Sequence, residues 1–122
     1  MNVLLVEDDE SIRSCLADLL VDAGLRVTSV ANAREALAVQ LLEDPSVLLA
    51  DVRLGPGMNG FVLVAAARQR WPGIRCVLMS GDPAAAQKGA GGQEGVGGPD
   101  LFLSKPFRAA QLLQALCGEV AW

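Results

Sequence analysis

The residues best suited to chemistry are acids that follow two short apolar runs. Glu7 and Asp8 come directly after Val3–Val6, and Asp51 ends the run that starts at Val47. In an open α/β sheet the C-terminal ends of parallel strands meet at one edge, where such proteins carry their functional groups. Clustered carboxylates repel one another, so their charged forms need a cation. The pattern predicts an all-oxygen metal site, which suits Mg²⁺, with Mn²⁺ as a possible substitute.

A hydroxyl and an ammonium group join the acids at the same predicted edge. Ser80 follows the apolar run 74–79, and Lys105 follows the run 101–103. A lysine there is a movable positive charge that suits an anion such as a phosphoryl group. We therefore take Asp51 as the reactive carboxylate and the other groups as its partners.

Taken singly, each of these residues has a simpler explanation. Glu7 and Asp8 suit the start of a helix, where acids interact favourably with the helix dipole. Ser80 with Gly81 is typical of a turn, and Lys105 is compatible with a surface position. Only the combination of all these groups at one sheet edge favours a chemical site.

The elements that must position these groups alternate along the chain. Apolar runs predict strands over 3–6, 25–30, 47–50, 74–79 and 101–103, and apolar stripes predict helices over 12–23, 32–42, 61–70 and after Pro106. Successive βα units with right-handed crossovers form an open parallel sheet with helices on both faces. We expect a flavodoxin-like, doubly wound, five-stranded α/β sheet of order 2-1-3-4-5. Six glycines and one proline within 89–99 predict a shortened or disordered fourth helix, since glycine is a poor helix former.

Composition limits the class of protein. The chain has 122 residues, 52% of them hydrophobic, which suits one domain over 1–122 with no effector domain. It has no apolar run of about 20 residues for a membrane span and no basic segment before Val3 for a signal peptide. A net charge of −4 without a Lys/Arg cluster argues against direct nucleic-acid binding. We expect a cytoplasmic protein.

The three cysteines and the absence of histidine remove several chemistries. Cys15, Cys76 and Cys117 are widely spaced and embedded in apolar sequence. Zinc sites need closer cysteine pairs or histidine, and Ser/His or Cys/His catalysis needs histidine. We expect all three cysteines to be reduced thiols within the core.

Four segments, in order, resemble the response-regulator receiver domain over essentially the whole chain. They are Glu7-Asp8-Asp9, Asp51 through Asn59-Gly60, Ser80-Gly81, and Phe102 through Lys105-Pro106-Phe107. The resemblance implies that Asp51 accepts a phosphoryl group. It implies that Glu7, Asp8, Asp51 and the backbone carbonyl of Arg53 bind Mg²⁺.

The resemblance also implies how the signal is produced. Lys105 would pair with the phosphoryl group, and Ser80 would hydrogen-bond it. Ser80 and Phe102 would act as the switch residues, and the Lys105-Pro106 peptide would be cis. Asp9, by contrast, we expect to be a helix N-cap or an exposed acid.

The implied activity is signalling rather than turnover. The phosphodonor would be a sensor histidine kinase or a histidine phosphotransfer protein. The output would be a conformational change or onward transfer of the phosphoryl group. We expect no direct contact with nucleic acid or membrane, and a monomer or weak dimer. Self-phosphorylation and slow self-dephosphorylation would be its only reactions.

Three alternatives remain at this point. A degenerate receiver would be a phosphorylation-independent interaction module, and the glycine-rich segment favours that alternative slightly. A Mg²⁺-dependent phosphatase would carry a second acid two residues after Asp51, where this chain has Arg53. A flavin- or nucleotide-binding domain would have a phosphate loop after the first strand, where Glu7-Asp8-Asp9 would repel phosphate.

Overall fold

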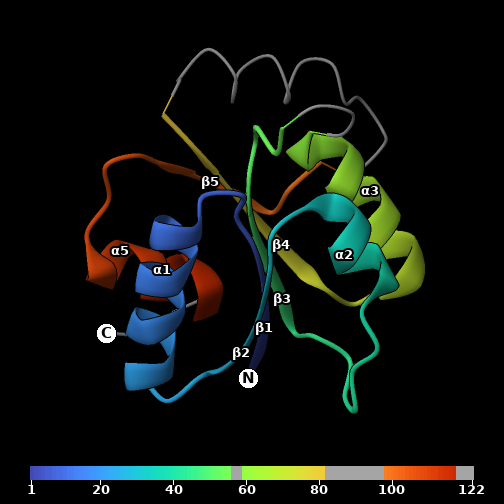
Figure 1. Ribbon diagram of the computed structural model, residues 1–122, viewed down its shortest axis with the longest axis horizontal. Helices are drawn as coiled ribbons and strands as arrows, with labels where there is room; N and C mark the ends of the chain where they lie inside the picture. Colours follow the sequence, from blue (N-terminus) through green and yellow to red (C-terminus); the bar gives the residue numbers. More distant parts are fainter. Residues whose placement is uncertain (56–58, 82–97, 118–122) are drawn as a thin grey trace.

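One parallel sheet of five strands forms the centre of the protein. The computed structural model describes residues 1–55, 59–81 and 98–117. Within them the strand order is β2-β1-β3-β4-β5, which confirms the predicted topology (Figure 1). The strands are β1 (Asn2–Val6), β2 (Arg26–Val30), β3 (Val47–Asp51), β4 (Arg75–Ser80) and β5 (Leu101–Ser104). The order reverses between β1 and β3, so these two strands lie side by side at the point where α/β folds bind ligands.

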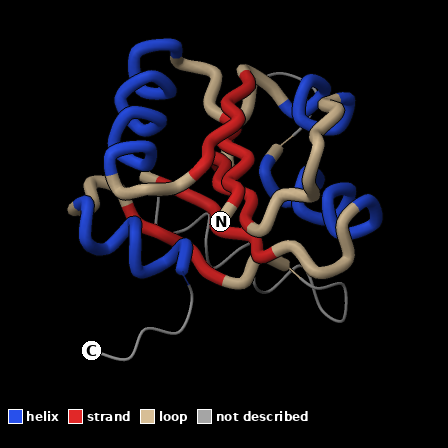
Figure 2. The backbone as a smooth tube through the Cα atoms, turned by 90° about the horizontal axis from the view of Figure 1, so that it is seen from below, coloured by secondary structure: helices blue, strands red, loops and turns tan. Residues whose placement is uncertain are grey.

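Within the described residues, two helices cover each face of this sheet. The helices α1 (Glu10–Asp22) and α5 (Ala109–Cys117) lie on one face, and α2 (Ala33–Ala38) and α3 (Gly60–Arg70) lie on the other. Figure 2 shows the same arrangement with the sheet between the two helical layers. None of the helices in the described ranges is both long and apolar enough to cross a bilayer.

The core consists of two apolar clusters separated by the sheet. Alternate residues of β1 divide between them: Leu4 and Val6 face α2 and α3, whereas Val3 and Leu5 face α1 and α5. Because β1 and β3 are buried on both faces, their sequences are continuous apolar runs rather than alternating patterns.

Polar side chains begin three of the helices. Asp9 accepts a hydrogen bond from the N–H of Ile12 at 2.9 Å and is the N-cap of α1, which agrees with the expected N-cap role. Asn32 begins α2 by accepting from the N–H of Glu35 at 2.8 Å, and Asn59 does the same for α3. Such caps satisfy backbone N–H groups that have no partner within the helix.

The second helix is shorter than predicted. We expected it to reach Leu42, but α2 ends at Ala38. The guanidinium of Arg70, at the end of α3, donates to the backbone carbonyls of Leu37 and Val39. Because these carbonyls accept hydrogen bonds from a side chain of α3, the helix ends there. Leu42, beyond this end, is fully exposed.

The prediction for the cysteines was wrong at two positions. Only Cys76, in β4, is buried; Cys15 and Cys117 are exposed, and none of the three forms a disulfide. Each exposed cysteine follows or precedes a buried leucine on its helix, but lies just outside the buried face. That face is narrower than the sequence stripe suggests, with Leu16 and Leu20 in α1. The predicted shortened fourth helix and the segment 89–97 lie outside the described residues.

Candidate functional site

A polar pocket of about 530 Å³ lies where the strands end. Its lining comes from the segments that follow β1, β3, β4 and β5: Glu7, Asp8, Asp9, Ile12, Asp51, Arg53, Ser80, Gly81 and Lys105. The fold therefore brings together every predicted site residue except Phe102. Sequence reasoning missed Ile12, which was assigned to the apolar stripe of its helix but is 42% exposed.

Asp51 is the last residue of β3, and both of its carboxylate oxygens have partners. Oδ1 accepts from the backbone N–H of Arg53 at 2.9 Å, and Oδ2 contacts the ammonium nitrogen of Lys105. The side chain of Asp51 is only 14% exposed, and the side chain of Lys105 is about one-third exposed. The pair is therefore partly withdrawn from water and reachable from the pocket.

Lys105 reaches Asp51 because β5 is aligned with β4. The backbone N–H of Lys105 donates to the carbonyl of Ser80 at 2.8 Å and continues the pairing that joins these strands. The Lys105-Pro106 peptide is cis. Ser80 is buried and lines the pocket.

Glu7 is the most deeply buried acid of the site, with 2% exposure. Its Oε2 accepts from the backbone N–H of Asp9 at 3.1 Å. Its Oε1 is buried and has no hydrogen-bond partner among the described atoms. Burial raises the pKa of Glu7 above its ordinary value, and the carboxyl groups of Asp8 and Asp51 raise it further. The Asp9 N–H and the Lys105 ammonium act in the opposite direction.

The backbone that carries Glu7 is held from two sides. The N–H of Glu7 donates to the carbonyl of Val30 at 3.1 Å, and the guanidinium of Arg13 donates to the carbonyl of Glu7 at 2.8 Å. The acids after β1 therefore stand on a fixed loop, although their charges repel one another.

The backbone of Asp51 packs closely against Gly60 at the start of α3. A Cβ atom added to Gly60 would lie 2.6 Å from the backbone oxygen of Asp51 and 2.9 Å from Cδ2 of Leu78. Only glycine allows this approach, and the close packing fixes where β3 ends.

The acids fit a hard divalent cation. Oε1 of Glu7 is buried without a hydrogen-bond partner among the described atoms, and the negative charge of Asp51 acts on the same carboxyl group, so a cation would be favourable here. Among the described residues, no three acidic, thiol or imidazole side chains lie close enough to enclose an ion by themselves. Mg²⁺ does not need such a cage, because it keeps several waters and takes only one or two carboxylates from the protein. Glu7, Asp8, Asp51 and the backbone carbonyl of Arg53 are the candidate ligands.

Phe102 lies away from the pocket. Its half-buried ring packs on the side of α2 and α3, and its centroid lies 5.8 Å from that of Phe61. The sequence did not suggest this aromatic partner, because Phe61 is far from Phe102 along the chain.

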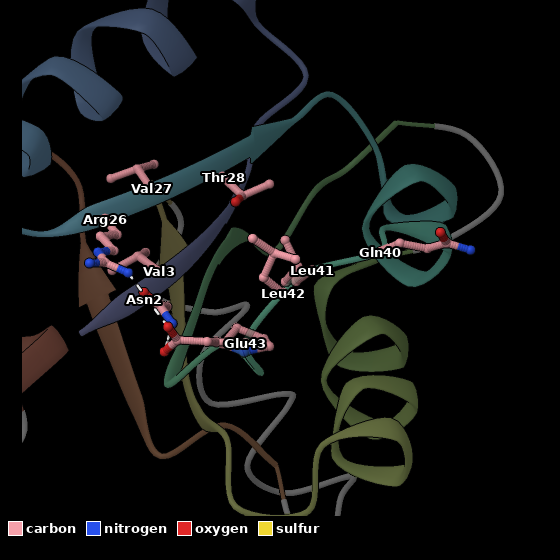
Figure 3. Close-up of a pocket in the computed structure, with 10 residues that line it drawn as sticks. Asn2, Val3, Arg26, Val27, Thr28, Gln40, Leu41, Leu42 and Glu43 are labelled. Carbon is pink, nitrogen blue, oxygen red and sulfur yellow. Dashed lines mark hydrogen bonds and ion pairs between the residues drawn. The ribbon is translucent and has the colours of Figure 1, made fainter.

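Hollows elsewhere on the described part of the protein were not predicted. One of about 330 Å³ lies at the N-terminal ends of β1 and β2, at the opposite end of these strands from the acids (Figure 3). There Glu43 accepts from the amide of Asn2 at 3.4 Å and lies 3.6 Å from the exposed guanidinium of Arg26. Another, of about 410 Å³, is apolar and adjoins the polar pocket, sharing Ile12 and Lys105 with it.

Comparisons with known proteins agree on one family. The family described as "Response regulator receiver domain" matches residues 3–117. The response regulator protein FleR of Pseudomonas aeruginosa is 36% identical over 91% of this chain and 23% of its own length. The chain spans less than a quarter of the first curated relatives that it matches.

Solved structures agree with this match. The chemotaxis protein CheY4 of Vibrio cholerae has 33% identity and a TM-score of 0.79, covering 95% of each chain. A response regulator protein of Burkholderia pseudomallei has 28% identity and a TM-score of 0.79, covering 94% of this chain and 65% of the other. Its structure contains a phosphorylated aspartic acid and a calcium ion.

Proposed function

The chain belongs to the response regulator receiver domain family, and on that premise we propose that it accepts a phosphoryl group on Asp51. Receiver domains are signalling modules of two-component systems, and phosphoryl acceptance is their general function. The observation that carries the proposal for this chain is the placement of Asp51 in a polar pocket with the ammonium of Lys105 on one of its oxygens.

In the proposed step a carboxylate oxygen of Asp51 attacks the phosphorus atom of a phosphohistidine. An O–P bond forms, the N–P bond breaks, and the departing imidazole takes a proton from solvent. No general base is needed, because the attacking carboxylate is already anionic. Lys105 would move from the carboxylate to the phosphoryl oxygens, whose charge a cation stabilises in the loose transition state of phosphoryl transfer.

We further propose Mg²⁺ as the metal of this site, with Mn²⁺ as a substitute. Its ligands would be Glu7, Asp8, Asp51 and the backbone carbonyl of Arg53. When bound, it would supply positive charge that offsets the charge of the transferred group. The buried and unpartnered Oε1 of Glu7 supports this assignment, since a buried carboxylate without a partner is costly.

The proposed readout begins at Ser80. Its hydroxyl would hydrogen-bond a phosphoryl oxygen, and this contact would favour one of two pre-existing arrangements of the surrounding loops. Phe102 is the second proposed switch residue. Its packing against Phe61 supports a role in which movement near Ser80 changes the packing of this aromatic pair.

The partner would be a sensor histidine kinase or a histidine phosphotransfer protein. The output would be a conformational change or onward transfer of the phosphoryl group, without turnover of a small substrate. A single domain over 1–122, a cytoplasmic location and a monomeric or weakly dimeric state remain predictions. They rest on the sequence and the family.

Phosphorylation is tested by intact mass after incubation with Mg²⁺ and acetyl phosphate. We expect a gain equal to one phosphoryl group, which is lost in Asp51→Asn and without Mg²⁺. Asp44→Asn is the matched control, because Asp44 is an exposed acid at the other end of the sheet. If neither acetyl phosphate nor a phosphohistidine protein modifies the wild type, the chain is a degenerate receiver. Repeated turnover of a phosphomonoester would instead indicate a phosphatase.

A further inference from the structure

We propose that Asp100 and Arg68 are positioning residues for phosphoryl transfer. They fix the register of β5 against β4 and so hold Lys105 beside Asp51. This inference deepens the proposed function and rests on it. Neither residue lines the polar pocket, and neither was singled out by the sequence.

Asp100 extends the pairing of β5 by one residue. Its backbone N–H donates to the carbonyl of Cys76 at 2.8 Å. Its Oδ2 accepts from the backbone N–H of Cys76 at 2.7 Å. Asp100 therefore binds both backbone groups of one residue in β4, immediately before the first strand pair, Val77 with Leu101. A slip of one residue would break both hydrogen bonds, because adjacent residues of a strand direct their N–H and carbonyl groups to opposite sides.

Arg68 connects Asp100, just before β5, to the helix α3. Its guanidinium donates to Oδ2 of Asp100 at 3.0 Å and to the carbonyl of Gly98 at 2.9 Å. Both side chains of the ion pair are about two-thirds buried. Arg68 belongs to α3, the helix that begins against the backbone of Asp51. The contact therefore connects the element that fixes Asp51 to the strand that carries Lys105.

The apolar pattern of β5 specifies its register only weakly. The strand has four residues, and among the described strands it pairs with β4 alone. Leu101 is 38% exposed and Ser104 is exposed, so Leu103 is the one buried residue of this strand. Register is strongly specified where one face of a strand is buried, and weakly where it is not. Contacts outside the strand must then supply the missing specificity.

A change of register would separate the reactive groups. One residue corresponds to about 3.3 Å along a strand and turns each side chain to the opposite face. In the observed register Ser80 pairs with Ser104, and the N–H of Lys105 reaches the carbonyl of Ser80. A slip would remove the Lys105 ammonium from the carboxylate of Asp51. Even a displacement of about 1 Å reduces rates strongly where catalysis depends on positioning.

A double-mutant cycle tests whether Asp100 acts through Lys105. The phosphorylation rate with acetyl phosphate and Mg²⁺ is measured for Asp100→Ala, Lys105→Ala and the double variant. We expect Asp100→Ala to slow phosphorylation roughly tenfold or more and to have no further effect when Lys105 is absent. Asp100→Asn should recover part of the rate, because its amide oxygen still accepts from Cys76. Glu43→Ala is the control, since its ion pair with Arg26 is exposed and remote from the site.

Mg²⁺ affinity separates positioning of Lys105 from a general loss of stability. Mg²⁺ affinity, measured by calorimetry, should be unchanged in Asp100→Asn, because the metal-binding acids do not lie on β5. Equal slowing by Asp100→Ala with and without Lys105 would overturn the proposal. If Asp100→Ala does not fold, Asp100→Asn replaces it in the cycle.

Amide hydrogen exchange tests the role of Asp100 and Arg68 without requiring that the protein accept a phosphoryl group. The N–H of Lys105 should exchange faster in Asp100→Asn and Arg68→Ala than in the wild type. Failure of the wild type to accept a phosphoryl group would refute the proposed function. The exchange rate of Lys105 would still decide whether Asp100 and Arg68 fix the strand, and unchanged exchange would refute the proposal.

Discussion

Replacing Glu7 with glutamine should stabilise the metal-free protein and remove its response to Mg²⁺. In the wild type the Oε1 atom of Glu7 is buried without a hydrogen-bond partner. After burial, the side-chain contact with Asp8 and the negative charge of Asp51 also raise the pKa of this carboxyl group. A glutamine has nearly the same shape, and its amide nitrogen would face these two acids as a donor. Its oxygen would still accept from the N–H of Asp9.

The unpartnered oxygen sets the size of the effect. A buried polar group without a partner costs about 1–3 kcal/mol, so we expect Glu7→Gln to raise the free energy of unfolding by about 1–3 kcal/mol at neutral pH. The pKa of Glu7 in the folded protein lies above its ordinary value of 4.5. Its contribution therefore favours folding below pH 4.5 and is lost as the pH rises through the folded-state pKa. The advantage of the variant should grow from acidic to neutral pH and then level off.

Urea unfolding from acidic to neutral pH, with and without Mg²⁺, measures both effects. A ligand at one hundred times its Kd stabilises a protein by about 2.7 kcal/mol, and the wild type should gain this amount while Glu7→Gln gains little. Glu10→Gln is the control, because Glu10 is exposed at the start of α1. The reasoning is refuted if metal-free Glu7→Gln is less stable than the wild type at neutral pH. It is also refuted if Mg²⁺ stabilises both proteins equally.

Two further predictions concern packing and thiol reactivity. Gly60→Ala should lower the free energy of unfolding by about 1–3 kcal/mol, because its Cβ would overlap the backbone of Asp51. Gly73→Ala is the control and should lower it far less, because the space around Gly73 is open. Equal losses of stability for the two variants in urea unfolding would contradict this prediction. A thiol reagent at mildly alkaline pH should modify Cys15 and Cys117 quickly in the native protein, and Cys76 only after unfolding. Burial raises the pKa of Cys76 to about 11, so little reactive thiolate forms. Mass spectrometry would follow the modification of each cysteine, and rapid modification of Cys76 in the native protein would refute this prediction.

The sheet was predictable because its signal is local. The runs that became β1 and β3 are apolar throughout, as expected for strands buried on both faces, and acids at their ends marked the site edge. The end of α2 was not predictable in the same way. It depends on Arg70, which lies 33 residues after Leu37 and contacts its carbonyl only because α2 and α3 share one face of the sheet.

The charged residues that line the polar pocket could be named from the sequence, but the residues that support them could not. Acids at strand ends can be recognised from the sequence, because every parallel strand ends at the same edge. The pairing of Arg68 with Asp100 spans 32 residues and depends on how the end of α3 packs near the start of β5. Ile12 and Cys15 show the same limit within one helix. An apolar stripe indicates a buried face, but only the packing of the neighbouring helix decides how wide that face is.

The early end of α2 leaves a mostly exposed segment, residues 40–44, between this helix and β3. Residues 40–44 run between the guanidinium of Arg70 at one end and β3 at the other, beyond the N-terminal ends of the strands. Leu42 is fully exposed there, and the ion pair of Glu43 with Arg26 lies in solvent, where such pairs contribute little stability. An inserted tag or a loop of different length at this point would not interrupt a strand or reach Asp51. We therefore expect changes of chain length at this end of the sheet to leave Asp51 in place, whereas the proposed phosphoryl transfer requires fixed positions at the other end.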